Sequence, residues 1–204
     1  MVSPAGNVVW EGHPGALTDS QIEQHLKEVQ LTPIFELPKV LSKAEEALNA
    51  GKYAKGMTAL AKFIAKHKSE DTTSVAAPNV QAARDALKKV KKYGLSQYKA
   101  AQRFAEDAYY AEAMRLMAEL EKGFKSTKLG DKAKAKSRSW KNDKIVKAEL
   151  KAGSLHERAK QLIRKKKYKQ AAAFLKRLLK SSSLAKTKTR VRAEETYRRI
   201  RQYL

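Results

Sequence analysis

The chain has 204 residues, of which 42% are hydrophobic, and a formal net charge of +23. An apolar fraction of this size excludes wholesale disorder and suits one large domain, or one domain with a small appendage. Cysteine is absent, which excludes disulfides, thiolate metal sites and thiol-based catalysis. No apolar run reaches the roughly 18 residues that a membrane span needs, and the first residues lack the pattern of a signal peptide. The sequence therefore predicts no membrane span and, as written, a cytoplasmic protein.

The charge is distributed unevenly along the chain. Residues 1–35 carry one lysine and four acids, whereas residues 156–204 carry 17 Lys or Arg and three acids. One interpretation is a solvated surface whose self-repulsion keeps the protein soluble. The other is attraction to a polyanion, which is a nucleic acid, an anionic lipid or an acidic protein. Charge alone leaves both interpretations open.

The first 35 residues differ from the rest of the chain. A turn-forming segment, residues 3–7, is followed by the β-prone residues 8–12, and this order predicts a short β-hairpin. A helix is predicted to begin after Thr18, because Thr18 and Gln21 form a capping box and Leu17 with Ile22 forms a hydrophobic staple.

This segment resembles the closing part of thioredoxin-like domains, in which the last hairpin leads into the final helix. The residues that carry the resemblance are Pro4, Gly6, Val8, Val9, Trp10, Gly12, His13 and Pro14. The redox activity of that family rests on a Cys-x-x-Cys motif and a cis-proline, and this chain starts after both. The resemblance implies common ancestry or a truncated reading frame, with His13 as a loop residue. It also implies that a longer product with the missing half would be a thiol–disulfide oxidoreductase and could be exported.

From residue 36 onward the pattern is helical, which predicts two parts, residues 1–35 and 36–204. Gly94 and Gly153 are predicted to end helices, and Ser154 with Glu157 forms a further capping box. Residues 96–122 contain no breaker, which leaves one long helix or two helices with a corner near Asp107. The other predicted helices comprise residues 38–49, 53–67, 78–94, 132–140, 143–152, 154–165, 168–180 and 187–203, with a polar loop at 69–77 and another loop at 123–131.

An internal repeat is centred on Tyr53, Tyr110 and Tyr168, which are 57 and 58 residues apart. Each tyrosine is predicted to mark the first turn of the second helix of a pair, whose small residue at +3 lets the first helix approach. The residues at +3, +7 and +10 are Gly56, Leu60 and Phe63, then Ala113, Met117 and Leu120, and finally Ala171, Leu175 and Leu178.

This pattern is similar to the helix–turn–helix unit of tetratricopeptide repeats, and residues 124–127 are similar to that family's exit from its second helix. Because the period exceeds the usual ~34 residues, extra helical material must lie between the units. The predicted fold is mainly α, a repeat-like array of helical hairpins with a short N-terminal β-hairpin and helix.

The sequence predicts no catalytic, cofactor-binding or metal-binding residue. Its four histidines are far apart and have no acidic cluster near them, as a metal site would require. No phosphate-binding glycine loop and no nucleophile motif is present. We therefore expect a protein that is not an enzyme.

The candidate binding residues are cationic, with one aromatic residue. Trp140 either anchors a partner or covers a seam between helices. The tyrosines Tyr53, Tyr109, Tyr110 and Tyr168 could stack on bases, but their recurrence at a buried corner favours core packing. The basic candidates are Arg164, Lys165, Lys166 and Lys167 in one run, and Lys188, Arg192 and Arg199 near one face of a helix.

The function expected first is a non-catalytic scaffold that binds a protein or peptide, preferably acidic, in the groove between helix pairs. The second is a basic helical protein that binds nucleic acid or another polyanion without sequence specificity. The third is the C-terminal part of a longer thiol–disulfide oxidoreductase.

Overall fold

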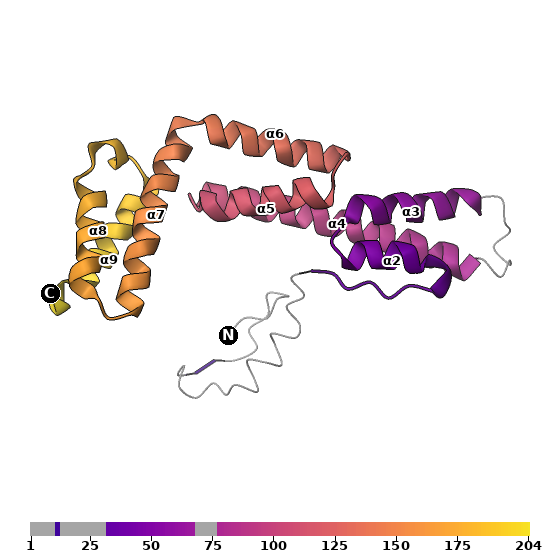
Figure 1. The fold of residues 1–204 in the computed structure, drawn as a ribbon, viewed down its shortest axis with the longest axis horizontal. Coiled ribbons are helices and arrows are strands. Elements are labelled where there is room, and N and C mark those ends of the chain that lie inside the picture. Colours follow the sequence, from indigo (N-terminus) through magenta and orange to yellow (C-terminus); the bar gives the residue numbers. More distant parts are fainter. Residues whose placement is uncertain (1–10, 13–31, 68–76) are drawn as a thin grey trace. The chain divides into compact units, whose positions relative to one another are not determined.

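The computed structural model describes residues 11–12, 32–67 and 77–204 (Figure 1). Within these ranges the chain is mainly helical and contains no strand. The elements are η2 (Lys39–Leu41), α2 (Ser42–Asn49), α3 (Tyr53–Lys66), α4 (Ala77–Glu106), α5 (Tyr110–Gly123), α6 (Lys128–Asn142), α7 (Lys144–Arg164), α8 (Tyr168–Lys180), η3 (Ser182–Leu184), α9 (Lys188–Ile200) and η4 (Arg201–Tyr203).

Some of the sequence-based expectations lie outside the described residues. These are the N-terminal β-hairpin with its following helix and most of the predicted loop at 69–77. The predicted boundary between residues 35 and 36 also stays a prediction. None of the helices in the described part of the chain is long and apolar enough to cross a membrane.

The chain divides into two compact units, Met1–Tyr93 and Gly94–Leu204, and the division falls within α4. In the described part of the first unit, α2 packs against α3 around Leu48 and Leu60, which are 1% and 0% exposed. The segment before α2 is held by Asn49, whose side chain donates to the carbonyl of Phe35 and accepts from its N–H. The first unit thus has its own apolar core.

In the second unit, α5 packs on α6, and α7, α8 and α9 form a three-helix group. The core of the three-helix group is made of alanines and leucines, among them Ala159, Ala171, Leu175 and Leu178, all 0% exposed. Small residues on α7 and α8 allow the helices to approach closely, and the leucines fill the space between them. The second unit carries the sites described below.

The three predicted repeat positions are structurally equivalent. Tyr53, Tyr110 and Tyr168 are the first residues of α3, α5 and α8. The residue two positions before each tyrosine has a left-handed backbone, with φ of 70°, 58° and 56° at Gly51, Ala108 and Lys166. At each corner the residue just before the tyrosine donates its N–H to the carbonyl five residues earlier, at 2.7–2.9 Å. The repeat predicted from the sequence is therefore a repeated helix–corner–helix geometry.

The side chains three and seven positions after each tyrosine are also placed as predicted, whereas Phe63, ten positions after Tyr53, is only half-buried. The small residues Gly56, Ala113 and Ala171 are buried, and the large residues seven positions after each tyrosine are 0% exposed. The extra helical material expected between the second and third units is α6. The array of helical hairpins is thus observed, with one added helix.

Two predicted helix ends are wrong. Gly94 lies inside the continuous α4. A side chain there would lie 2.6 Å from both Phe124 and Leu129, so only glycine lets these groups approach. Gly153 lies inside the continuous α7, because Ala152, His156 and Ala159 bury one face across it. The predicted capping box after Gly153 is consequently wrong as well. Tertiary packing offsets the roughly 1 kcal/mol that a helix-interior glycine costs.

Residues 96–142 differ in two respects from what the sequence left open or predicted. The chain turns a corner at Ala108, so residues 96–122 belong to two helices. The predicted loop at 123–131 is shorter than expected. Thr127 ends it by accepting from the N–H of Gly130 at 3.2 Å, which starts α6 four residues earlier than predicted.

Candidate functional site

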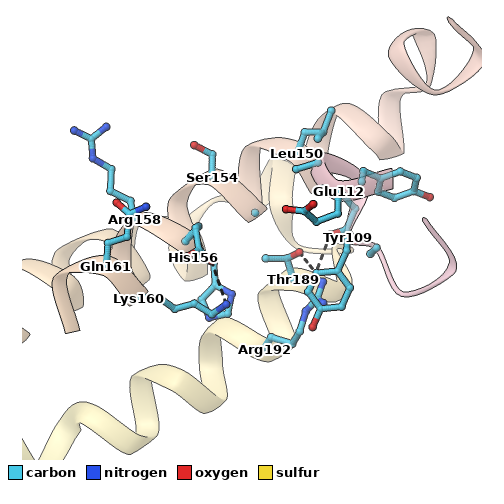
Figure 2. A pocket seen from close by; sticks show the side chains of 16 residues that line it. Tyr109, Glu112, Leu150, Ser154, His156, Arg158, Lys160, Gln161, Thr189 and Arg192 are labelled. Carbon is cyan, nitrogen blue, oxygen red and sulfur yellow. Dashed lines mark hydrogen bonds and ion pairs between the residues drawn. The ribbon is translucent and has the colours of Figure 1, made fainter. Parts of the chain in front are cut away.

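A groove runs along one face of α7 in the second unit. Its larger part is a cavity of about 730 Å³ between the α4–α5 corner, α7 and the start of α9 (Figure 2). A second cavity of about 490 Å³ lies between α7 and α8. Arg158 and Gln161 line both cavities, so the two adjoin along α7. We call this combined feature the α7 groove.

Arg192 of α9 is held in place on the wall of the larger cavity. Its guanidinium carbon lies 4.1 Å from the ring centroid of Tyr109, and its Nη2 donates to the hydroxyl of Thr189 at 3.0 Å (Figure 2). Arg192 is half-buried, and among the described residues no carboxylate lies within ion-pair distance of it. A stacked guanidinium with free donors is a fixed binding group for an anion.

Glu149 lies at the same end of the groove but has another role. Its carboxylate is 4% exposed and accepts from the backbone N–H groups of Lys188 and Thr189, the first two residues of α9. The side chain of Thr187 accepts from the next N–H group, that of Arg190, at 3.2 Å. Because the N-terminus of a helix attracts negative charge, Glu149 is a cap supplied by another helix.

His156 lies on α7 beside these groups. The hydroxyl of Thr196 donates to the carbonyl of Arg192, so the imidazole Nε2–H donates to the Thr196 oxygen, at 2.9 Å. Burial, followed by the charges of Lys160 and Arg192, lowers the pKa of the imidazole, and Glu157 acts weakly in the opposite direction. The imidazole is therefore a neutral group that packs α7 against α9.

The basic candidates fall into two separate places. Lys188 and Arg192 face the α4–α5 corner, where the Lys188 ammonium donates to the carbonyl of Glu106 at 2.8 Å. Arg199 is exposed near the other end of α9. The run Arg164, Lys165, Lys166 and Lys167 is exposed at the α7–α8 corner, and of these Lys165 lines the groove.

Trp140 is not an exposed anchor. It is 7% exposed, lies in an edge-to-face contact with Tyr110 at 5.9 Å between ring centroids, and is covered by the Lys136 ammonium. Of the two interpretations of Trp140, the structure favours the seam between helices, here α5 and α6.

Sequence reasoning missed several residues of the groove. The sequence favours core packing for Tyr109, yet the side chain is 46% exposed and supports Arg192. Glu149 lies among lysines, as a surface acid would, and nothing in its local sequence indicates that it caps a helix 39 residues away. Nothing in the local sequence of Arg158 indicates its contact with Phe174 either, in which the guanidinium carbon lies 5.5 Å from the ring centroid.

Comparisons with protein-family models, with curated proteins and with solved structures gave no match to this chain. The function is therefore argued from the geometry alone.

Proposed function

We propose that this chain is a non-catalytic scaffold that binds an acidic protein segment in the α7 groove. The observation that carries the proposal is the presence of two adjoining cavities along one helix, with Arg158 and Gln161 in the lining of both. A pocket that holds a small metabolite is enclosed, whereas a groove that follows a helix offers successive contacts to an extended or helical segment.

The composition of the groove supports a peptide that is both acidic and apolar. Leu150 of α7 lines the larger cavity, and Leu162 and Phe174 line the smaller one. The cationic groups are Arg192 at one end, Arg158 and Lys160 in the middle and Lys165 at the far end. The larger cavity is also lined by Glu112, Glu157 and the capping Glu149, so the acidic preference rests on the cations that these carboxylates leave unpaired. Aromatic and aliphatic surface supplies affinity, and guanidinium groups add specificity for carboxylates.

The two resemblances found in the sequence enter the same proposal. The repeated corners support a tetratricopeptide-like scaffold, a class in which the surfaces between helix pairs hold peptides. The thioredoxin-like ending in residues 1–35 supports a scaffold that is the C-terminal part of a thioredoxin-like protein. Sequencing the gene upstream of Met1 tests this second point, because an in-frame Cys-x-x-Cys domain is expected and an early stop codon would contradict it.

Fluorescence anisotropy with a labelled peptide of alternating Glu and Leu tests the groove. Substituting Arg192→Ala or Arg158→Ala in the full chain is expected to weaken binding about tenfold or more, because each removes a charge-assisted contact of roughly 1.5–3 kcal/mol. The matched control is Lys132→Ala, which removes the same charge from the exposed face of α6 and lines neither cavity. This control is expected to change the affinity less than twofold.

Equal losses in all three variants would show that the peptide is attracted by net charge and not by the groove. Equally tight binding of a peptide with Gln in place of Glu would refute the acidic preference. Circular dichroism of each variant establishes that the helices are intact.

A further inference from the structure

A second surface lies at the opposite end of the three-helix group from the α4–α5 corner. Here the α7–α8 corner and the end of α9 meet, and in Figure 1 the C-terminus lies beside that corner. The ring of Tyr203 stacks on the ring of Tyr168, with 4.8 Å between centroids and 19° between planes, which fixes the two segments together. We call this surface the basic end, and its cations are Arg164, Lys165, Lys166, Lys167, Lys169, Arg198, Arg199 and Arg201.

The positive charge of the basic end is largely uncompensated. All eight cationic residues are exposed. Residues 158–193, which include five of these eight, contain fourteen Lys or Arg and no Asp or Glu, and Glu194 and Glu195 precede the other three. Among the described residues, Arg164 lies 3.8 Å from Glu157, and none of the other seven is within ion-pair distance of a carboxylate. Such a concentration of one charge attracts a polyanion.

The stacked tyrosines distinguish one kind of polyanion from the others. Tyr203 is 57% exposed although one face of its ring covers Tyr168, so the opposite face is the one available to a further ring. An open aromatic face next to cations is the arrangement on which unpaired bases stack, with the backbone phosphates held by Lys and Arg. A duplex hides its bases, and carboxylate side chains have no flat ring that stacks on a tyrosine.

We propose that the basic end binds single-stranded nucleic acid, with a base stacked on Tyr203 and the backbone phosphates held by the surrounding cations. The stack on Tyr168 holds the Tyr203 ring in position, so little side-chain entropy is lost when a base is added. This proposal does not depend on the α7 groove, because Tyr203, Lys169, Arg199 and Arg201 line neither of its cavities.

The test measures binding of the full chain to a labelled oligothymidylate at several salt concentrations. Tyr203→Ala is expected to weaken binding by about 5- to 150-fold, the range for loss of one base–aromatic stack, and to leave the salt dependence unchanged. Tyr203→Phe keeps the ring and is expected to bind as the unmodified chain does. The triple substitution Lys169→Ala, Arg199→Ala and Arg201→Ala is expected to reduce the slope of log K against log salt by about 2, at ~0.7 for each phosphate contact.

Heparin, a polyanion without aromatic groups, and vesicles rich in phosphatidylserine are the comparison probes. Heparin binding is expected to fall in the triple variant and to be unaffected by Tyr203→Ala. An equal effect of Tyr203→Ala on heparin and on the oligonucleotide, or no effect on either, would overturn the base-stacking proposal. Vesicle binding that is tighter than oligonucleotide binding and lost in Tyr203→Ala would assign the surface to a membrane instead.

Discussion

Glu149, on α7, stabilises α9 by direct contact, since both carboxylate oxygens accept from backbone N–H groups at the start of that helix. A helix begins with N–H groups that have no partner within the helix, and leaving them buried and unpaired costs free energy. Because Glu149 is 4% exposed, no water replaces it easily. Glu149 thus joins α7 to the start of α9, in addition to the contact of His156 with Thr196.

Replacing this carboxylate tests its role. Glu149→Ala is expected to lower the free energy of unfolding of the second unit by about 2 kcal/mol, and Glu149→Gln by less, since the amide keeps an oxygen acceptor. The measurement is urea unfolding, with hydrogen exchange of the α9 amides as the local readout. Glu119→Gln is the control, because it removes an exposed ion pair with Arg115 and is expected to cost under about 0.5 kcal/mol. An equal cost for the two sites would contradict the capping role.

His156 gives the second unit a dependence on pH. Its pKa is below the ordinary value of 6.5 because of burial and the neighbouring Lys160 and Arg192. Below pH 6.5 the imidazole binds a proton more readily in the unfolded state than in the folded state, so acidification favours unfolding. The stability contributed by the neutral imidazole is complete above pH 6.5 and is lost as the pH falls toward the lowered pKa of the folded state.

Comparison with a variant that does not titrate isolates this effect. Between pH 7.5 and 5.5 the unmodified chain is expected to lose more stability than His156→Gln, by at most about 1.4 kcal/mol for each pH unit. Urea unfolding at several pH values measures the difference. Parallel pH profiles for the two proteins would show that the folded and unfolded imidazoles have the same pKa.

At the scale of elements, the two glycines within helices have opposite surroundings. A side chain at Gly94 would lie 2.6 Å from Phe124 and Leu129, and Phe124 is only 2% exposed. A side chain at Gly153 would have no neighbour within 4 Å. Substitution by alanine is therefore expected to change the free energy of unfolding in opposite directions at the two positions.

Gly153→Ala is expected to raise the free energy of unfolding by up to about 1 kcal/mol, the helix-propensity difference between the two residues. Gly94→Ala is expected to lower it by about 1–3 kcal/mol, because overpacking outweighs the same gain. Urea unfolding of both variants measures the two signs. Stabilisation by Gly94→Ala would mean that the ring of Phe124 moves aside.

The same elements show how far sequence reasoning reaches. The spacing of Tyr53, Tyr110 and Tyr168 indicates three helix starts, because each tyrosine belongs to a local pattern of apolar residues, although the absence of a breaker leaves the start at Tyr110 open until the structure is seen. Glycine marked the corner at residue 51, whereas Ala108 and Lys166 adopt the same left-handed conformation without that signal. Conversely, Gly94 and Gly153 are predicted to end helices but lie inside them, since glycine indicates a helix end only where no packing continues the helix.

The candidate site was predictable only in part, for a related reason. Arg192 was identified from its place in a basic stripe, but Tyr109, which holds it, is 83 residues away. The groove itself arises where α7 meets α5, α8 and α9, and no local pattern of residues encodes that meeting. Charges and periodicities are local properties, whereas concave surfaces depend on tertiary packing.

At the scale of the whole molecule, the charge is divided unequally between the two units. Residues 94–204 hold 31 Lys or Arg against 11 Asp or Glu, which gives +20 of the total +23. Exposed ion pairs, such as those of Arg115 with Glu112 and Glu119, compensate little of this charge. Self-repulsion therefore opposes the folding of the second unit much more than that of the first.

Salt is expected to stabilise the second unit, because the screening length falls from about 30 Å at 0.01 M to about 8 Å at 0.15 M. The fluorescence of Trp140, which is 7% exposed between α5 and α6, reports thermal unfolding of this unit in a Trp10→Phe background. The midpoint is expected to rise by several degrees over this range, since about 1 kcal/mol shifts a domain of this size by roughly 4–8 °C.

The double substitution Lys132→Glu and Arg138→Glu on the exposed face of α6 is expected to raise the low-salt midpoint and to reduce the salt response. The same reversal at Lys39 and Lys43, in the nearly balanced first unit, is expected to leave the Trp140 midpoint unchanged. A midpoint that falls with added salt would mean that ion pairs outweigh self-repulsion, and the excess charge would then not be available to attract a polyanion.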